Sequence, residues 1–356
     1  MGVKQRMKAV DLKAINQLEL VEKEKPVPKK GEVLLHVMAC GICGSDIPRV
    51  YVTGSYHFPT VLGHEFAGEI VEVAEDIDRD YIGKKAAVFP LLPCNECEYC
   101  QSGYYAQCKN YNYFGSRTDG GFEEYLAVPV FNLVLLEDQV SYEEGAMVEP
   151  ATVAQHVINK AELSVGDSVV IYGAGPIGVM VAQWAQINGA GKVLLIDIDP
   201  TKVSFAQELG FSYVCNSEEQ DAEAFILETL DGKLADVAIE ATGSSAAFDQ
   251  CAQSIRTFGR VVLLGNPHSD MTMGQKTYDQ FMRKEGTIVG MFNSIYEHFP
   301  KNEWQVTAQA IATKQLNLKP LVTHKVLIED LIDAFDMIHE KKEFYNKVLM
   351  VDEKLL

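Results

Sequence analysis

The sequence predicts an α/β protein in which a doubly wound parallel sheet of the Rossmann type is joined to a β-rich domain. Two observations indicate this fold. Residues 173–178 (GAGPIG) form a glycine-rich turn between an apolar strand and an apolar helix, and strand and helix patterns alternate from there to about residue 290. Residues 1–39 instead contain three strand-like runs, MKAVDL, NQLELVEKE and GEVLLHVMA, with the last two separated by PVPKKG. The chain therefore begins with a barrel-like region and continues into an open parallel sheet.

The composition is that of a globular protein with room for two domains. The chain has 356 residues, of which 47% are hydrophobic, and its formal net charge is −19. This charge argues against a nucleic-acid partner, because phosphate backbones require a basic face. It also means that an anionic substrate would need local basic residues. No apolar run approaches the roughly 20 residues of a membrane helix, and the N-terminus lacks the apolar segment of a secretory signal. We therefore expect a cytoplasmic protein that has no membrane partner.

A thiolate, an imidazole and a carboxylate lie close together in the loop-rich segment of residues 40–68. Cys43, His64 and Glu65 offer the mixed sulfur, nitrogen and oxygen ligands of a catalytic zinc, which keeps one position open for water or substrate. Cys40 and Cys43 also form a Cys-x-x-Cys pair. The thioredoxin-like βαβ pattern that accompanies a redox pair is missing, so we interpret Cys40 as a buried packing residue.

Four further cysteines follow at the spacing Cys-x2-Cys-x2-Cys-x7-Cys, namely Cys94, Cys97, Cys100 and Cys108. Four thiolates this close in sequence match a closed structural zinc site, with tight turns between the first three ligands. The alternative is an iron–sulfur cluster. In ferredoxin motifs, however, the fourth cysteine follows after three residues and precedes a proline, whereas Cys108 follows after seven and precedes Lys109. We therefore expect a zinc ion that holds a surface loop together.

The glycine-rich turn has the spacing Gly-x-Gly-x-x-Gly that is typical of dinucleotide binding. The first glycine allows the turn, the second admits a pyrophosphate to the backbone, and the third lets the helix pack on the strand. An aspartate ends the next strand, KVLLID, where its carboxylate can accept the adenosine ribose hydroxyls and would repel a 2′-phosphate. No arginine follows it, so the predicted cofactor is NAD rather than NADP. The predicted cofactor-binding residues are Gly173, Gly175, Pro176, Ile177, Gly178 and Asp197.

The motifs CGICGSD, GHEFAGEIVEV and DGGF, together with the four-cysteine lobe, resemble the zinc-dependent medium-chain alcohol and polyol dehydrogenases. The resemblance covers essentially the whole chain. It implies a discontinuous, GroES-like catalytic domain, residues 1–155 and 293–356, and a Rossmann domain, residues 156–292, with the active site in the cleft between the domains. It also implies two zinc ions per chain, one catalytic and one structural, and a homodimer or homotetramer.

The resemblance assigns roles around the catalytic zinc. Cys43 and His64 would be ligands, Ser45 would bond the substrate hydroxyl and pass on its proton, and Asp46 would orient the His64 ring. Many relatives have a histidine three residues beyond the serine, as part of the site or its proton relay. Pro48 stands there in this chain and cannot serve, so the exit of the relay differs.

The third zinc ligand is expected to be Glu149 rather than Glu65. Polyol-type members of the family place a glutamate at this Glu-Pro position near the zinc, where alcohol-type members often have cysteine. If both glutamates ligated beside Cys43, three anionic ligands would surround the ion, which is more than a site with an open position usually needs. Glu65 is then a candidate exchange ligand that alternates with water.

The segments SDIPR, PLLPC, GSRTDGGF and MFNS narrow the expected substrate. Together they resemble the galactitol-phosphate-oxidising members of the family more than the sorbitol, threonine or butanediol dehydrogenases. This implies oxidation of a secondary alcohol of a sugar-alcohol phosphate, with galactitol 1-phosphate giving tagatose 6-phosphate. Arg49 or Arg117 would meet the phosphate. The alternatives are a free polyol of the sorbitol or xylitol type, threonine and, more remotely, a non-catalytic NAD-binding protein.

Overall fold

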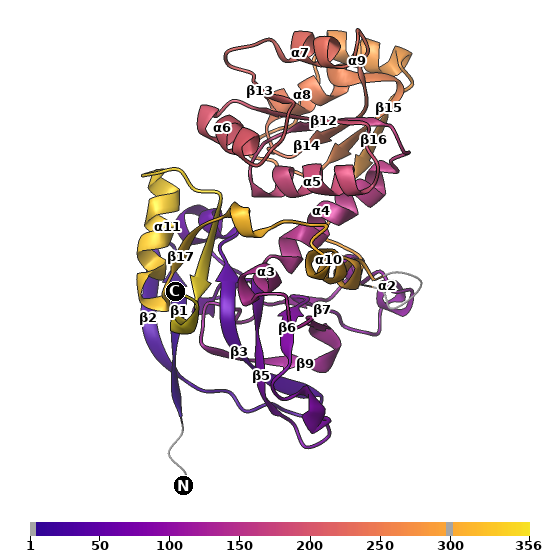
Figure 1. The fold of residues 1–356 in the computed structure, drawn as a ribbon. Coiled ribbons are helices and arrows are strands. Elements are labelled where there is room, and N and C mark those ends of the chain that lie inside the picture. Colours follow the sequence, from indigo (N-terminus) through magenta and orange to yellow (C-terminus); the bar gives the residue numbers. More distant parts are fainter. Residues whose placement is uncertain (1–4, 297–301) are drawn as a thin grey trace. The chain divides into compact units, whose positions relative to one another are not determined.

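The chain divides into a discontinuous β-rich unit and a continuous α/β unit, and this confirms the predicted fold class. The computed structural model describes residues 5–296 and 302–356. The β-rich unit comprises Met1–Pro150 and Ile295–Leu356, and the α/β unit comprises Ala151–Ser294. Figure 1 shows both units, coloured along the sequence. The sequence prediction put the corresponding boundaries after residues 155 and 292.

The β-rich unit is built on a seven-stranded sheet that brings the two ends of the sequence together. Its central strand β3 pairs antiparallel with β5, so that Gly41 lies opposite Glu65. On the other side β3 pairs with β18 from the end of the chain, with Leu349 opposite Gly41. The strands of this sheet are β3 (Glu32–Gly41), β5 (Glu65–Val73), β6 (Lys85–Val88), β9 (Tyr125–Pro129), β10 (Leu133–Leu135), β17 (Val322–Val326) and β18 (Lys347–Val351).

Two smaller sheets complete the unit. The N-terminal hairpin and one short strand form a three-stranded sheet, and the remaining pair lies on either side of the four-cysteine segment. The hairpin and β3 confirm the three strand-like runs that the sequence predicts for residues 1–39. The strands are β1 (Arg6–Ala14), β2 (Gln17–Glu24) and β4 (Thr60–Val61) in the first sheet, and β7 (Leu91–Leu92) and β8 (Asn112–Tyr113) in the second.

The helices of this unit are short apart from the one that leads into the α/β unit. Helix α3 begins with a capping box, in which Ser141 and Glu144 satisfy each other's backbone amides. Among the described residues, none of the helices is long and apolar enough to cross a bilayer. The helices are α1 (Asp46–Pro48), the π-helix η1 (Arg49–Thr53), α2 (Glu98–Gln101), α3 (Tyr142–Ala146), α4 (Val148–Ala161), α10 (Glu303–Ala312) and α11 (Leu331–Glu340).

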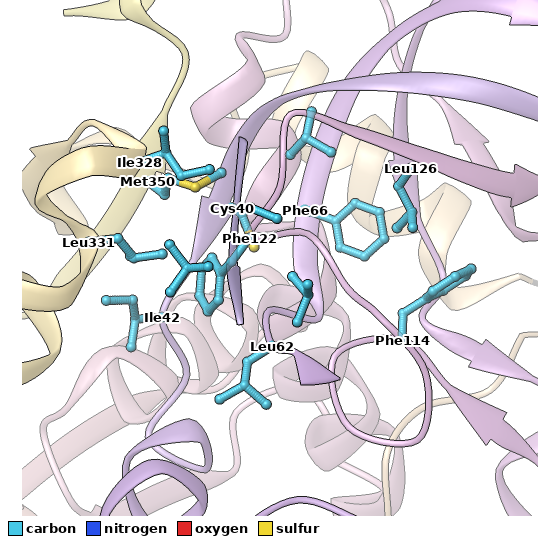
Figure 2. Close-up of a cluster of buried hydrophobic side chains, with 14 of the residues drawn as sticks. Cys40, Ile42, Leu62, Phe66, Phe114, Phe122, Leu126, Ile328, Leu331 and Met350 are labelled. Atoms are coloured by element: carbon cyan, nitrogen blue, oxygen red, sulfur yellow. The ribbon is translucent and has the colours of Figure 1, made fainter. Parts of the chain in front are cut away.

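An apolar core between the sheets and helix α11 fixes the strands that carry the candidate site. Cys40, Phe66 and Phe122 are almost completely buried in it, and Leu331 and Met350 join them from the C-terminal segment (Figure 2). Complete burial of an aliphatic or aromatic side chain of this size contributes about 1.5–3 kcal/mol. The core therefore holds β3 and β5 in register, and the position of Cys40 within it agrees with its interpretation as a packing residue.

The α/β unit is a doubly wound parallel sheet with the strand order β13-β12-β11-β14-β15-β16. The order reverses beside β11, where ligands bind at the carboxyl ends of the strands in such folds. The strands are β11 (Ser168–Tyr172), β12 (Lys192–Asp197), β13 (Val214–Asn216), β14 (Ala235–Glu240), β15 (Ile255–Leu263) and β16 (Thr287–Gly290). The helices, which lie on both sides of the sheet (Figure 1), are α5 (Pro176–Ile187), α6 (Pro200–Glu208), α7 (Ala222–Thr229), α8 (Ser245–Ser254) and α9 (Gln275–Arg283).

Candidate active site and zinc sites

The turn after β3 brings together Cys43, Ser45 and Asp46. The Asp46 carboxylate accepts a hydrogen bond from the Cys43 amide at 3.0 Å, and the Asp46 amide donates to the Cys43 carbonyl at 2.9 Å. The Ser45 hydroxyl donates to Cys43 Sγ at 3.3 Å. Asp46 is fully buried. Burial raises the pKa of its carboxyl, but the charges of His64 and Arg49 and the Cys43 amide outweigh burial and lower it, so the carboxylate stays ionised.

His64 directly precedes β5 and faces this carboxylate. Its Nδ1 lies 3.5 Å from Asp46 Oδ1, and it is buried without a hydrogen bond among the described residues. This leaves Nε2 as the nitrogen available to a metal, with Asp46 as the group that orients the ring. Burial lowers the pKa of His64, but the negative charges of Asp46 and Cys43 outweigh burial and raise it. The surroundings of the ring therefore favour a positive charge.

Three donor atoms converge at this point. The sulfur of Cys43, a ring nitrogen of His64 and a carboxylate oxygen of Glu65 all lie within 4.8 Å of one another. Zinc binds such ligands at about 2.0–2.3 Å in tetrahedral geometry, so a small inward movement of the side chains completes the contacts. Thiolate and imidazole ligands also favour zinc over magnesium or calcium. The donor set therefore fits a zinc ion.

The carboxylate of Glu65 already has a buried cationic partner, Lys347 from β18. The Lys347 ammonium pairs with Glu65 Oε2 and donates to the Ile42 carbonyl at 3.1 Å, and both side chains are almost fully buried. Burial lowers the pKa of Lys347, but the charges of Glu65 and Cys43 outweigh burial and raise it, so the lysine stays protonated. Gly41 makes room for the pair, because a Cβ there would overlap Glu65 Oε2 and lie 2.8 Å from Lys347 Cε.

Glu149 lies in the first turn of α4 and is also buried. The Tyr113 hydroxyl donates to its Oε1 at 3.5 Å, and the Tyr113 ring lies 6.0 Å from the His64 ring, centroid to centroid. Burial raises the pKa of Glu149 to about 7. Among the described residues, the donor set within 4.8 Å contains Glu65 and not Glu149. Both glutamates thus lie near His64, and within the described part of the chain it is Glu65 that pairs directly with Lys347.

The four cysteines of the lobe form a separate cluster. The sulfur atoms of Cys94, Cys97, Cys100 and Cys108 lie within 4.8 Å of one another, and Cys100 Sγ lies 3.5 Å from Cys97 Sγ and 3.9 Å from Cys94 Sγ. Tetrahedral zinc–sulfur bonds of about 2.3 Å place the sulfurs about 3.8 Å apart, so the cluster fits zinc. The Cys100 and Lys109 amides lower the pKa of the Cys97 thiol to about 6, whereas burial raises that of Cys100 to about 12.

The glycine-rich turn has the shape that a dinucleotide requires. Gly173 has φ 112° and its amide donates to the Ile196 carbonyl at 2.7 Å. A Cβ on Gly178 would overlap the Gly173 carbonyl, whereas a Cβ on Gly175 would meet no atom within 4 Å. The open space at Gly175, at the N-terminus of α5, fits a pyrophosphate. Asp197 accepts hydrogen bonds from the amides of Ala174 at 2.7 Å and Asp199 at 2.9 Å, so it also braces the turn.

The two arginines that the sequence singles out have different surroundings. Arg49 Nη1 donates to Ser45 Oγ at 3.1 Å and pairs with Asp46 Oδ1 at 3.3 Å, so it belongs to the turn beside the zinc ligands. Arg117 lies instead between two tyrosine rings, with its Cζ 4.0 Å from the centroid of Tyr56 and 4.6 Å from that of Tyr111.

Sequence reasoning did not identify Lys347 and Tyr113 as members of the site. Lys347 opens β18, whose five residues are all buried, and a lysine in such an apolar strand is a signal for a buried acidic partner. Tyr113 carries no comparable signal, because its position beside His64 and Glu149 depends on how the lobe packs.

The fold and these sites define an alcohol-dehydrogenase-like oxidoreductase. The signature of the alcohol dehydrogenase GroES-like domain matches residues 29–138, and that of the zinc-binding dehydrogenases matches residues 176–312. The chain therefore belongs to the zinc-dependent medium-chain dehydrogenase family.

Relatives within the family differ in substrate and cofactor. The chain is 32% identical to galactitol 1-phosphate 5-dehydrogenase from Escherichia coli K12 over 91% of this chain and 94% of the relative. It is 31% identical to sorbitol dehydrogenase from Bacillus subtilis, over 98% of each chain. The crystal structure of galactitol-1-phosphate dehydrogenase from Escherichia coli superposes with a TM-score of 0.90 at 31% identity, covering 97% of this chain and 100% of that one. A zinc-binding dehydrogenase from Sinorhizobium meliloti, bound to NADP, superposes equally well at 26% identity, covering 98% and 100%.

Proposed function

We propose that the protein is a zinc-dependent NAD oxidoreductase that oxidises a secondary alcohol of a sugar-alcohol phosphate, with galactitol 1-phosphate giving tagatose 6-phosphate. The observation that carries the proposal is the convergence of Cys43, His64 and Glu65 beside the Ser45 hydroxyl and the Asp46 carboxylate. The similarity to galactitol 1-phosphate 5-dehydrogenase over most of the chain supports this substrate.

In this proposal Cys43, His64 and Glu149 hold the catalytic zinc, with Glu65 as the exchange ligand. The pairing of Glu65 with Lys347 supports this assignment, because it leaves Glu149 as the buried carboxylate that still requires a positive charge. Zinc at this position would polarise the substrate hydroxyl and lower its pKa. The four cysteines of the lobe hold the second, structural zinc.

Ser45 receives the proton that the substrate hydroxyl gives up. Its oxygen accepts a hydrogen bond from Arg49 at 3.1 Å and its hydrogen is donated to Cys43 Sγ at 3.3 Å, which leaves one lone pair of the serine oxygen for the substrate hydroxyl. Arg49 cannot accept the proton, because a guanidinium has donors only. Pro48 stands at the usual histidine position and has no group that could take the proton further, so the path beyond Ser45 differs from that of relatives with a histidine there.

NAD binds at the turn of residues 173–178, and Asp197 receives the adenosine ribose. The carboxylate at the end of β12 supports NAD over NADP, because it would repel a 2′-phosphate. The proposal includes a homodimer or homotetramer. The edge strand β16 supports an oligomer, because its exposed edge and the exposed Ile288 could pair with a second copy of the chain.

A substrate panel tests the proposal. Galactitol 1-phosphate, galactitol, sorbitol and threonine are each offered with NAD and with NADP, and formation of the reduced cofactor is measured. We expect the highest kcat/KM with galactitol 1-phosphate and NAD. A higher value for sorbitol or threonine would favour one of the alternative dehydrogenase activities, and no turnover with any compound would favour a non-catalytic protein.

A further inference from the structure

We infer that Arg117, and not Arg49, is the phosphate-binding residue, and that Tyr56 and Tyr111 hold its guanidinium ready as a rigid anion clamp. The inference rests on the proposed function for the identity of the substrate. The clamp itself is a property of this chain and is argued from its contacts alone.

Among the residues that the structure describes, Arg117 lacks an acidic partner, although the protein is strongly acidic. The chain has 50 Asp and Glu residues against 31 Lys and Arg. Within the part of the chain that the structure describes, every arginine except Arg79 and Arg117 has a carboxylate within 4.0 Å, the paired ones being Arg6, Arg49, Arg256, Arg260 and Arg283. Arg79 lies on an exposed turn. Arg117 is partly buried, so a bound anion would balance its charge.

Two tyrosine rings contact the guanidinium of Arg117 and leave its N–H groups free. Tyr56 and Tyr111 lie against its guanidinium at 4.0 and 4.6 Å, and such cation–π contacts cover a planar cation while leaving the N–H groups at its edge free. Those N–H groups form the fork that binds phosphate oxygens in pairs. A guanidinium fixed in this way loses little side-chain entropy when the anion binds.

Hydrogen bonds connect the loop of residues 55–57 to the loop that carries Arg117. The Ser55 hydroxyl donates to the Ser116 carbonyl at 2.7 Å, and His57 Nε2 lies 3.1 Å from the Arg117 carbonyl. Thus three consecutive residues, Ser55, Tyr56 and His57, each contact the segment Ser116–Arg117. These hydrogen bonds fix the backbone on either side of Arg117, and the two tyrosine rings limit where its guanidinium lies.

The loop that carries Arg117 is hydrogen-bonded to the segment that precedes the zinc ligand His64. The Gly121 amide donates to the Gly63 carbonyl at 2.7 Å, and Gly120 donates to Val61 at 2.9 Å, so the loop that carries Arg117 packs on the residues before His64. A row of rings makes the same connection.

In that row the Tyr113 ring lies 6.0 Å from the His64 ring, and the Tyr111 ring lies 6.3 Å from Tyr113. The next step is the 4.6 Å contact from Tyr111 to Arg117. Packed rings thus connect Arg117 to the surroundings of His64.

The charge of Arg49 is already balanced by a buried carboxylate. Its Nη1 is committed to Ser45 Oγ and to Asp46, and turning it toward a phosphate would leave the fully buried Asp46 carboxylate without this cation. We therefore treat Arg49 as a positioning residue for Ser45.

The test compares Arg117→Gln and Arg117→Lys with a matched control, Arg79→Gln, which removes the other unpaired arginine. We expect Arg117→Gln to lose 10- to 100-fold in kcat/KM for galactitol 1-phosphate, mainly through KM, because a charged hydrogen bond to the phosphate is lost. Arg117→Lys keeps the charge but not the planar fork, so its loss should be smaller. Turnover of unphosphorylated galactitol should be unchanged, which also shows that the variants fold. Arg79→Gln should behave as the wild type with both substrates.

A second readout does not depend on the substrate. The ³¹P resonance of inorganic phosphate broadens when the ion exchanges with a protein site. With saturating NAD present, so that the pyrophosphate site at residues 173–178 is occupied, we expect this broadening with the wild type and Arg79→Gln but not with Arg117→Gln. Equal losses on both polyols, or broadening that survives in Arg117→Gln, would overturn the clamp. If the wild type prefers an unphosphorylated substrate, the proposed substrate is wrong, and the clamp then stands or falls by the ³¹P result alone.

Discussion

Lys347→Met tests whether the buried Glu65 carboxylate depends on the Lys347 ammonium for its stability. Methionine keeps the unbranched stem of the side chain but removes the ammonium that pairs with Glu65 and bonds the Ile42 carbonyl. Lys347 and Glu65 are only 3% and 1% exposed, so water cannot replace the lost partner. Removing one member of a buried ion pair costs about 3–5 kcal/mol, because the other charge stays buried and uncompensated. We expect this loss in the zinc-free protein, and a smaller loss when zinc supplies a positive charge beside Glu65.

Urea unfolding measures this effect, and the distribution of the tryptophans makes it specific. The chain has two tryptophans, one in each unit: Trp184 in the α/β unit and the fully buried Trp304 in the β-rich unit. In a Trp184→Phe background the fluorescence of Trp304 therefore follows the unit that contains Lys347. With a urea dependence of about 3 kcal/mol per molar, the zinc-free midpoint should fall by about 1–2 M.

The double variant Glu65→Gln with Lys347→Met is the matched control. It removes both charges and should recover most of the lost stability, since replacing a whole buried pair is often neutral. A loss below about 1 kcal/mol in the single variant, or a double variant no more stable than the single one, would refute the reasoning that Glu65 depends on this lysine.

Three further predictions concern the zinc ions and the glycine-rich turn. Zinc analysis should give two ions per chain in the wild type and in Glu65→Gln. It should give one ion in Cys97→Ser, which loses a thiolate of the closed site, and one in Glu149→Gln. Two ions in Glu149→Gln would show that Glu149 is not a ligand. Gly178→Ala should lower the stability of the α/β unit by more than about 3 kcal/mol, because its Cβ would overlap a backbone carbonyl. Gly175→Ala should fold normally yet bind NAD at least about 10-fold more weakly by calorimetry, since its Cβ would occupy open space at the turn; unchanged affinity would place the pyrophosphate elsewhere.

Much of the fold could be predicted because its signals are local. The apolar strand before residue 173 and the apolar helix after it predict a strand–turn–helix unit of a parallel sheet. Gly173 has a positive φ at that turn, a conformation that glycine adopts without steric cost. The four cysteines of the lobe fall within fifteen residues of sequence, so their convergence follows from short turns.

The remaining features depend on contacts between distant parts of the chain. Lys347 meets Glu65 only because β18 pairs with the end of β3 and β5 pairs with the other side of β3. No local pattern carries that information. The same holds for Arg117, whose tyrosine partners come from two different loops. The sequence could name Arg49 and Arg117 as alternatives. Their contacts distinguish them, because Arg49 lies beside Ser45 and Asp46, whereas Arg117 has no acidic partner among the described residues.

Product analysis tests directly whether the protein oxidises a sugar-alcohol phosphate with zinc and NAD. Zinc-loaded protein is incubated with galactitol 1-phosphate and NAD, and NADH and the sugar phosphate are quantified together, with and without prior removal of zinc. The account predicts one NADH for each tagatose 6-phosphate formed, and the loss of both products when the zinc is removed. Equal rates before and after zinc removal, or no tagatose 6-phosphate beside the NADH, would contradict it.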